Sequence, residues 1–315
     1  MISQVRKVLG SLLAMFLFLT CTPPSSSASP IALGASIWGA PQDPAKIDEF
    51  TRMVGHLPAI IMWYQDWVHS GEKEFDPLQM NAVVTRGAIP MVTWEPWDDM
   101  AGPFQPAYSL RTIIAGTHDA YIRHWASDAR TWGRPMYLRF AHEMNGNWYS
   151  WSPSINGNMP AEYVAAWRHV VNIFREEGAT NVQWVWSPNV AYPGSTPFAD
   201  LYPGDSYVDW VGMDGYNGGT ALSQQWQSFS QIFQPSYETL AAMTNKPMMI
   251  AETASTEVGG NKAAWIKQAL LVDLPAKFPR IHIVIWFNEN KETNWCVNSS
   301  PQSLAAYREI VRSLS

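Results

Sequence analysis

The sequence predicts a single-domain (β/α)8 barrel, in which eight parallel strands alternate with helices. Eight short runs rich in β-branched and aromatic residues recur after residue 30, and amphipathic segments separate most of them. Each run begins nearly all-apolar, as strands buried on both faces of a parallel sheet do. Each run ends in polar, glycine or aromatic residues. This repeated alternation over one long chain favours a barrel.

The eight expected strands span residues 31–39, 59–67, 88–97, 135–143, 182–189, 208–217, 247–255 and 281–290. A doubly wound open sheet is the alternative fold, and it usually carries a glycine-rich phosphate-binding loop after its first strand. The segment 34–41, GASIWGAP, lacks that pattern. No linker, repeat or low-complexity tract follows residue 30, so we expect one domain.

Helical segments begin and end at recognisable residues. Segment 43–55 opens with Asp43 and Pro44 and closes at Gly55, and segment 76–87 repeats this pattern. An acidic cap, a proline in the first turn and a terminal glycine are typical of helix boundaries. Further helices are expected at 159–178, 261–278 and 300–314, whereas 190–207 is rich in Pro and Gly and predicts irregular structure.

The first residues resemble an export signal. Arg6 and Lys7 precede the apolar run 8–20, and small residues follow up to Ala28. The run is short for a membrane span, so we expect residues 1–28 to be a cleaved signal peptide and residues 29–315 to form the catalytic barrel of an extracellular or periplasmic protein. A lipoprotein anchored at Cys21 is the less favoured alternative, because the residues before Cys21 are large.

Composition narrows the partners. The formal net charge is −6 and no Lys/Arg-rich run occurs, which argues against nucleic acid as a partner. Cys296 is the single cysteine left after cleavage, so no intramolecular disulfide is possible. The chain has 17 Trp, and several stand in loop-like segments such as 93–99 and 146–151. Flat aromatic faces suit sugars, so we expect a polysaccharide as the binding partner. We also expect a monomer without a cofactor or a membrane span.

Two glutamates stand at equivalent places in the pattern. Glu143 closes the fourth expected strand and Glu252 the seventh. Because the carboxyl ends of barrel strands meet at one rim, the two side chains should face each other. A buried glutamate satisfied by Arg139 or by a backbone donor is the alternative for each one alone. A matched pair across the barrel mouth instead favours glycosidic-bond cleavage, which uses two carboxylates.

Neighbouring residues fit such a site. Arg139 and His142 can donate hydrogen bonds to the carboxylates, and Asn145 and Asn189 can bond sugar hydroxyls. The residues that we expect to stack on sugars or line the cleft are Trp94, Trp97, Trp148 and Trp286. No metal is expected, because HEMNG at 142–146 lacks the second histidine of a zinc helix and the other histidines show no ligand spacing.

The motif RFAHEMNGNWYSW at 139–151, together with PMMIAETAS at 247–255, resembles glycoside hydrolase family 26, a family of β-mannanases and some mixed-linkage β-glucanases on a (β/α)8 barrel. The resemblance implies that Glu143 is the proton donor and Glu252 the nucleophile. It implies that Tyr216 bonds the nucleophile. The family's supporting residues match Arg139 and His142, and its cleft aromatics match Trp148 and Trp286.

The resemblance also implies a retaining enzyme, whose carboxyl groups should lie roughly 5–5.5 Å apart. An endo-β-1,4-mannanase is the first expectation. Phe140 and Ala141 replace the Pro-Leu pair often found in mannanases of the family, and this keeps a mixed-linkage β-1,3-1,4-glucanase or endoglucanase open. A non-catalytic carbohydrate-binding barrel is the third possibility, although such a barrel would be expected to have lost one of the glutamates.

Overall fold

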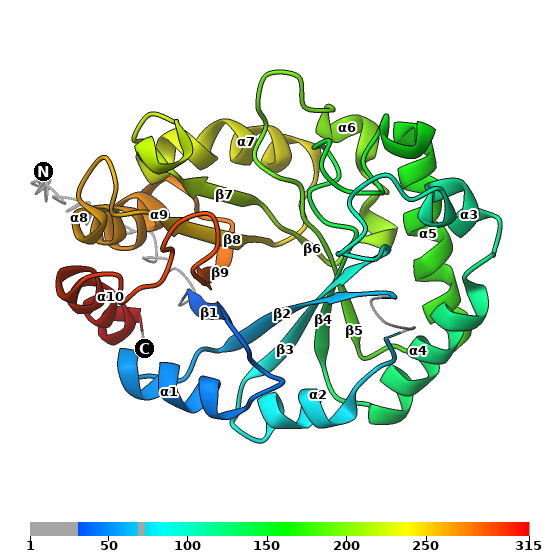
Figure 1. The fold of residues 1–315 in the computed structure, drawn as a ribbon, viewed down its shortest axis with the longest axis horizontal. Coiled ribbons are helices and arrows are strands. Elements are labelled where there is room, and N and C mark those ends of the chain that lie inside the picture. The colour runs from blue at the N-terminus through cyan, green and yellow to red at the C-terminus, as the bar shows by residue number, and fades with distance from the viewer. Residues whose placement is uncertain (1–30, 69–72, 315) are drawn as a thin grey trace, which may run out of the picture.

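The protein forms a closed barrel of parallel strands surrounded by a ring of helices, which confirms the predicted single-domain (β/α)8 fold (Figure 1). This is a computed structural model that describes residues 31–68 and 73–314. The predicted signal peptide, residues 1–28, lies outside the described residues. Within the described residues, no helix is both long and apolar enough to cross a membrane.

All strand pairs are parallel, in the order β6-β5-β4-β3-β2-β1-β9-β8-β7, and an additional β6–β8 pairing closes the ring. The sixth predicted strand is divided into β6 and β7, which accounts for nine labels on eight barrel positions. The strands are β1 Ala32–Ile37, β2 Ile60–Asp66, β3 Ile89–Glu95, β4 Met136–Phe140, β5 Val182–Trp186, β6 Trp210–Val211, β7 Asp214–Asn217, β8 Met248–Ser255 and β9 Ile281–Asn288.

The helices cover the outside of the barrel (Figure 1). They are α1 Ala45–Val54, α2 Pro77–Val84, α3 Leu110–Ile114, α4 Asp119–Trp132, α5 Pro160–Glu176, α6 Phe198–Leu201, α7 Phe229–Met243, α8 Lys262–Lys267, α9 Leu274–Lys277 and α10 Pro301–Leu314. A π-helical segment, Gln268–Asp273, joins α8 to α9. Helix α7 carries Pro235 in its interior, which weakens its signal in the sequence.

Local chemistry sets the predicted helix boundaries. Asp76 caps α2 by accepting hydrogen bonds from the N–H groups of Leu78 and Gln79. Gly55 ends α1 with φ of 91°, a left-handed conformation that glycine adopts at little cost. The segment 190–207 contains only the four-residue α6 and a short 3₁₀ turn, as its Pro and Gly content predicts.

Seven of the eight predicted strands start within one residue of the observed strand, and the sixth is predicted to start two residues before Trp210. Most predicted strands run too far at their carboxyl ends. β4 shows the reason. Ala141 and Glu143 have φ of 43° and 50°, so the chain leaves the extended conformation just where the polar residues begin. These strand ends therefore become the turns that form the barrel mouth.

Two layers form the core. A smaller cluster inside the barrel includes Ile60, Met62, Met249 and Ile285. A larger cluster lies between strands and helices, and it contains most of the buried tryptophans. Most of the tryptophans therefore pack between the strands and the helices rather than in the cleft. The composition alone had emphasised sugar binding instead.

Candidate active site

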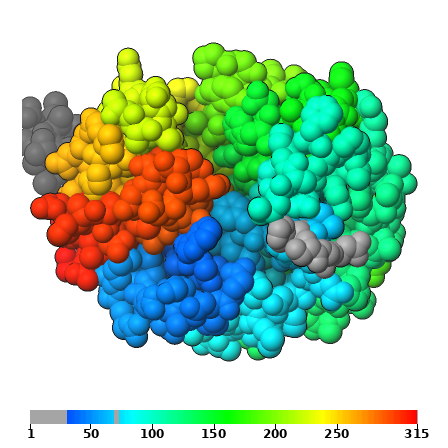
Figure 2. Space-filling model, in the orientation of Figure 1, coloured from blue at the N-terminus to red at the C-terminus, as the bar shows by residue number. Residues whose placement is uncertain are grey.

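The two glutamates predicted to be catalytic lie at the same end of the barrel. Glu252 is in β8, and its partner in β7 is Asp214. Glu143 follows β4, and its N–H donates to the carbonyl of Ser187, just beyond β5, at 2.7 Å. One carboxylate oxygen from each of Glu143, Asp214 and Glu252 lies within 4.8 Å of the other two. The loops that follow β1, β3 and β9 surround a hollow on the face shown in Figure 2.

Arg139 organises this acidic cluster from inside the barrel, where its side chain has no exposed surface. Its guanidinium donates to Glu252 Oε1 and to Asp214 Oδ2, both at 2.5 Å. Tyr216 donates its hydroxyl to Glu252 Oε2. Both oxygens of Glu252 are therefore acceptors, the pattern of an ionised carboxylate. The predicted partners of Glu252 are thus in place.

Glu143 has different surroundings. The indole Nε1 of Trp148 donates to Glu143 Oε2 at 2.8 Å. Burial, followed by the negative charge of Glu252, raises the pKa of Glu143 from its usual 4.5 to about 7. A carboxyl group with that pKa can hold its proton at neutral pH and release it to a leaving group. The two glutamates therefore differ chemically through their environments.

His142 contributes differently from the expectation. Its Nε2 is 3.0 Å from the Tyr149 hydroxyl, and among the described residues no hydrogen bond joins His142 to either glutamate. Burial, and then the positive charge of Arg139, hold the pKa of His142 well below its usual 6.5, so the imidazole is neutral. His142 Nδ1 lies 3.9 Å from Glu95 Oε1.

Glu95 ends β3 beside His142. Its side chain is almost fully buried. Burial raises the pKa of Glu95 from 4.5 to about 8. At neutral pH this group is largely a carboxylic acid, which can both donate and accept a hydrogen bond. Glu95 is therefore a polar group poised beside the cleft.

Two predicted sugar-stacking tryptophans belong to the core instead. Trp94 is fully buried, and its Nε1 donates to the Tyr121 hydroxyl at 3.3 Å. Trp286 is 1% exposed, and its Nε1 donates to the carbonyl of Trp295 at 3.0 Å. Side chains alternate along a strand, and Ile285 points into the barrel, so Trp286 must point outward. The prediction that these two residues line the cleft is wrong.

The remaining predicted binding residues occupy the barrel mouth with unequal roles. Trp148 is half-buried, bonds Glu143 and stacks on Tyr192 with ring centroids 5.9 Å apart. Trp97 is half-buried and meets Tyr149 edge-on. Asn189 is half-buried, and its main-chain N–H and carbonyl both bond the amide of Asn145. Asn145 is thus a loop tie rather than a sugar ligand.

The residues proposed to shift the substrate from mannan to glucan are not in the cleft. Phe140 is buried against Trp67, Trp94 and Trp167 in the outer core layer. Ala141 is also fully buried. The altered flank before Glu143 therefore acts on packing, and it cannot contact a sugar.

The fold brings to the site three residues to which the sequence assigned no role there. Asp214 binds Arg139, Tyr64 from β2 lies 6.0 Å from His142 between ring centroids, and Trp295 lies 5.1 Å from the Tyr216 ring. The sequence does point to Asp214, because this residue lies in the polar end of the sixth predicted strand, close to Tyr216. Trp295 stands in a loop without periodicity, so no local pattern points to it.

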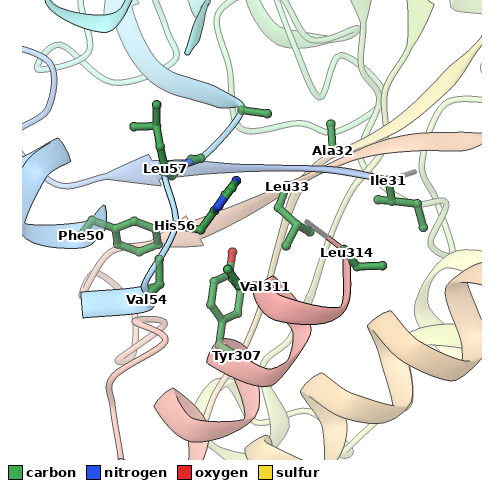
Figure 3. A pocket seen from close by; sticks show the side chains of 12 residues that line it. Ile31, Ala32, Leu33, Phe50, Val54, His56, Leu57, Tyr307, Val311 and Leu314 are labelled. Carbon is green, nitrogen blue, oxygen red and sulfur yellow. The ribbon is translucent and has the colours of Figure 1, made fainter. Parts of the chain in front are cut away.

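An apolar pocket of about 220 Å³ lies at the opposite, amino-terminal end of the barrel. Leu33, Phe50, Val54, Leu57 and Tyr307 are among its lining residues (Figure 3). None of the acids described above lines it, and its walls come from the start of β1, the end of α1, the segment 56–59 before β2, and α10. This pocket is separate from the carboxylate cluster.

A (β/α)8 barrel with two facing glutamates at its carboxyl rim defines a barrel of the glycoside hydrolase class. The family model for glycosyl hydrolase family 26 matches residues 109–276. The chain belongs to this family, which confirms the resemblance seen in the motif around Glu143.

Curated relatives agree with this placement. Endoglucanase H of Acetivibrio thermocellus is 41% identical over 288 residues, which cover 90% of this chain and 30% of that protein. A mannan endo-1,4-β-mannosidase of Bacillus subtilis is 27% identical over 180 residues, covering 55% of this chain and 43% of that protein. The chain thus spans less than half the length of both relatives.

Solved structures share the fold. The catalytic domain of a Bacillus sp. JAMB-750 family 26 endo-β-1,4-mannanase superposes with a TM-score of 0.69 at 21% identity, covering 90% of this chain and 86% of that one. A family 26 β-mannanase from Bacteroides ovatus gives a TM-score of 0.66 at 19% identity, with 91% and 89% coverage. At these identities the likeness concerns the barrel alone.

Proposed function

We propose that the protein is a retaining glycoside hydrolase in which Glu143 is the acid/base and Glu252 the nucleophile. The observation that carries this proposal is the carboxylate pair, whose nearest oxygens lie within 4.8 Å while their partners differ. Retaining enzymes need this short spacing, because the nucleophile must reach the anomeric carbon directly. Inverting enzymes hold a water molecule between the acids and need a wider gap, about 6.5–9.5 Å.

The geometry supports a two-step reaction. In the first step, Glu143 gives its proton to the glycosidic oxygen while a Glu252 oxygen attacks the anomeric carbon, so the glycosidic bond breaks and a glycosyl ester forms. In the second step, ionised Glu143 takes a proton from water, whose oxygen attacks the same carbon and releases Glu252. Arg139 and Tyr216 hold Glu252 in place throughout.

Single substitutions separate the two roles. Glu252→Ala should abolish turnover of every substrate, since no group remains to form the ester. Glu143→Ala should slow polysaccharide hydrolysis severely, yet spare the first step with an activated aryl glycoside, whose leaving group needs no proton. Near-wild-type rates on polysaccharide for both variants would refute the assignment. NMR of the first-formed anomer tests retention independently.

For the substrate, we propose an internal β-linkage of a glucan, as cut by mixed-linkage glucanases and endoglucanases. The supporting observation is the 41% identity to endoglucanase H over 90% of the chain, against 27% over 55% for a Bacillus mannosidase. Mannan, the first expectation from the motif, remains the second candidate because family 26 mannanases share the barrel. Buried polar groups near the cleft, Glu95 above all, suit the selection of a hydroxyl.

A substrate panel decides between these candidates. Lichenan, carboxymethylcellulose, galactomannan and β-1,3-xylan should be incubated with equal enzyme, and reducing ends should be counted. A site that bonds an equatorial C2 hydroxyl rejects the axial one strongly, because its own polar groups are left unpaired. Cleavage of galactomannan alone would favour mannan. Binding without cleavage of any polysaccharide would favour a non-catalytic barrel.

We also propose that the protein is exported after cleavage near residue 28 and acts as a monomer. The support is the pattern of Arg6, Lys7 and the apolar run 8–20. Intact mass of the protein recovered from the medium or periplasm of a bacterial host tests cleavage, and light scattering tests the monomer. A lipid-modified Cys21 in a membrane fraction would favour the anchored alternative.

A further inference from the structure

A fully buried lysine lies outside the catalytic cluster. Lys262 is the first residue of α8 and has no exposed surface. Its ammonium donates to the carbonyls of Trp295 at 3.1 Å and Cys296 at 2.7 Å, and to the hydroxyl of Ser299 at 2.9 Å. Burying an ammonium is costly unless every proton is bonded. A lysine placed so has a specific structural task.

The positive charge of Lys262 is balanced by the carboxylate of Glu257, to which it is linked through the Ser299 hydroxyl. Ser299 and Ser303 both donate their hydroxyls to Glu257 Oε1 at 2.7 Å. Lys262, Ser299 and Glu257 thus form a chain that joins the loop after β8 to the loop after β9. Each of the two carbonyls has a second donor, Trp286 Nε1 for Trp295 and the Ser299 N–H for Cys296. Removing Lys262 would therefore take away one of two donors from each carbonyl and leave this part of the loop less firmly held.

The carbonyl that Lys262 binds belongs to a residue that supports the nucleophile. Trp295 is 2% exposed, and its carbonyl also accepts from Trp286 Nε1 at 3.0 Å. Its ring packs against the Tyr216 ring with centroids 5.1 Å apart. The Tyr216 hydroxyl in turn donates to Glu252. One packed path therefore connects Lys262 to the proposed nucleophile.

We propose that Lys262 is a positioning residue: it fixes the loop after β9 so that Trp295 holds Tyr216 against Glu252. Among the described contacts, the Lys262 ammonium makes no hydrogen bond to Glu252. This inference rests on the proposed role of Glu252 as nucleophile. Trp286 also contributes, although it is buried in the core, because its indole is the second donor to the Trp295 carbonyl.

Lys262→Met tests the proposal, because Met keeps the length and apolar volume of the side chain without its donors. On the polysaccharide that the wild type cuts best, kcat should fall about tenfold, equal to ~1.4 kcal/mol, while KM changes less than about twofold. Lys277→Met is the matched control. Lys277 bonds Ser230 and Asp273 in the helix layer, so its loss should leave kcat unchanged.

A double-mutant cycle shows whether the effect passes through Tyr216. If it does, adding Lys262→Met to Tyr216→Phe should lower kcat by less than about twofold further, because the hydrogen bond being positioned is already absent. Ser299→Ala, which removes one Lys262 acceptor, is the milder variant if Lys262→Met folds poorly. It should lower kcat in the same direction and lose its effect in the Tyr216→Phe background.

Two outcomes overturn the proposal. Independent, multiplicative losses in the double variant would make Lys262 a general stabiliser. A normal kcat for folded Lys262→Met, or for folded Ser299→Ala when the first variant does not fold, would remove its link to the site. A wild type without hydrolytic activity would instead refute the proposed function. Tyr216→Phe would then be inactive as well, so this result cannot be mistaken for either of the first two.

Discussion

At the scale of single residues, Glu143 and Glu252 are chemically distinguished by what surrounds them rather than by their own chemistry. Glu252 accepts from a guanidinium and a phenol. Glu143 accepts from one indole and is partly buried, and its desolvation, followed by the negative charge of Glu252, raises its pKa to about 7. This division gives Glu143 the raised pKa that its proposed role as acid/base requires.

The indole of Trp148 tunes that pKa, since its hydrogen bond to the carboxylate lowers the pKa of Glu143. The rate of the first step falls as pH rises through this pKa, because Glu143 must be protonated. Trp148→Phe keeps an aromatic wall but loses the donor. Its alkaline midpoint in kcat/KM should therefore move up by roughly 0.7 pH unit, from a bond worth ~1 kcal/mol.

The pH profile of Trp148→Phe should be recorded beside that of Trp97→Phe, whose ring lies near Tyr149 and makes no hydrogen bond to Glu143 among the described contacts. The second variant should keep the wild-type midpoint. An unchanged or lower midpoint in Trp148→Phe would show that the indole does not set the protonation of Glu143.

Glu95 should make the stability of the protein depend on pH. Its pKa is about 8 in the folded protein and 4.5 when unfolded, so the folded state binds the extra proton between these values. Stability is then full at low pH and declines as pH rises toward 8, by at most ~1.4 kcal/mol per unit. Glu95→Gln removes this loss.

The measurement is the melting temperature of the wild type and of Glu95→Gln at pH 5, 6, 7 and 8. The difference between the variant and the wild type should increase in favour of the variant at each step. A difference that stays constant across this range would mean that Glu95 is not protonated by burial.

At the scale of elements, the loops after β4 and β5 are tied by one side chain. The Asn145 amide donates to the Asn189 carbonyl at 2.8 Å and accepts from the Asn189 N–H at 2.9 Å. Because Glu143 lies in the first of these loops, this pair of hydrogen bonds helps to fix the position of the Glu143 carboxyl group at the barrel mouth. Glycine at 146 fits the same loop, since a Cβ there would meet the Trp148 ring at 2.5 Å.

Asn145→Ala should cost about 2 kcal/mol in urea unfolding, since two partly buried main-chain groups of Asn189 lose their partner. It should also lower kcat/KM by displacing Glu143. Asn189→Ala is the matched control, because the Asn189 groups involved belong to the main chain and survive the change. Equal losses of stability in the two variants would contradict the tie.

At the scale of the whole molecule, the outer layer of aromatic side chains holds the helices on the barrel. Trp286 from β9 packs edge-on against Trp265 of α8 and Tyr307 of α10. Its place in this layer explains why a residue near the carboxyl end of a strand is unavailable to substrate. The cleft and the core draw on the same residue type, and strand orientation decides between them.

Trp286→Ala should therefore lower the free energy of unfolding by about 3–5 kcal/mol, the range for large core aromatics. Trp148→Ala should leave stability nearly unchanged and reduce kcat/KM instead. Urea unfolding and kinetics per folded molecule, measured on both variants, compare them directly. A stable Trp286→Ala variant with a raised KM would restore its role as a sugar platform.

By itself, the sequence determined the barrel, most strand starts and the rim positions of Glu143 and Glu252, and it named Arg139 and Tyr216 as their neighbours. These depend on local signals: apolar runs, helix boundaries and polar residues where a run ends. The family motif then supplied the pairing of acid and nucleophile. Such features can be predicted from the sequence alone, because each is encoded within about ten neighbouring residues.

The tertiary structure alone decided which aromatics face the cleft, which acid is protonated and what holds the loops. Trp286 and Trp94 follow strand alternation into the core, whereas Trp148 turns toward Glu143 after a backbone with positive φ. The raised pKa of Glu95 and the burial of Lys262 come from segments far apart in the chain. Burial and electrostatic coupling are sums over spatial neighbours, so no local pattern contains them.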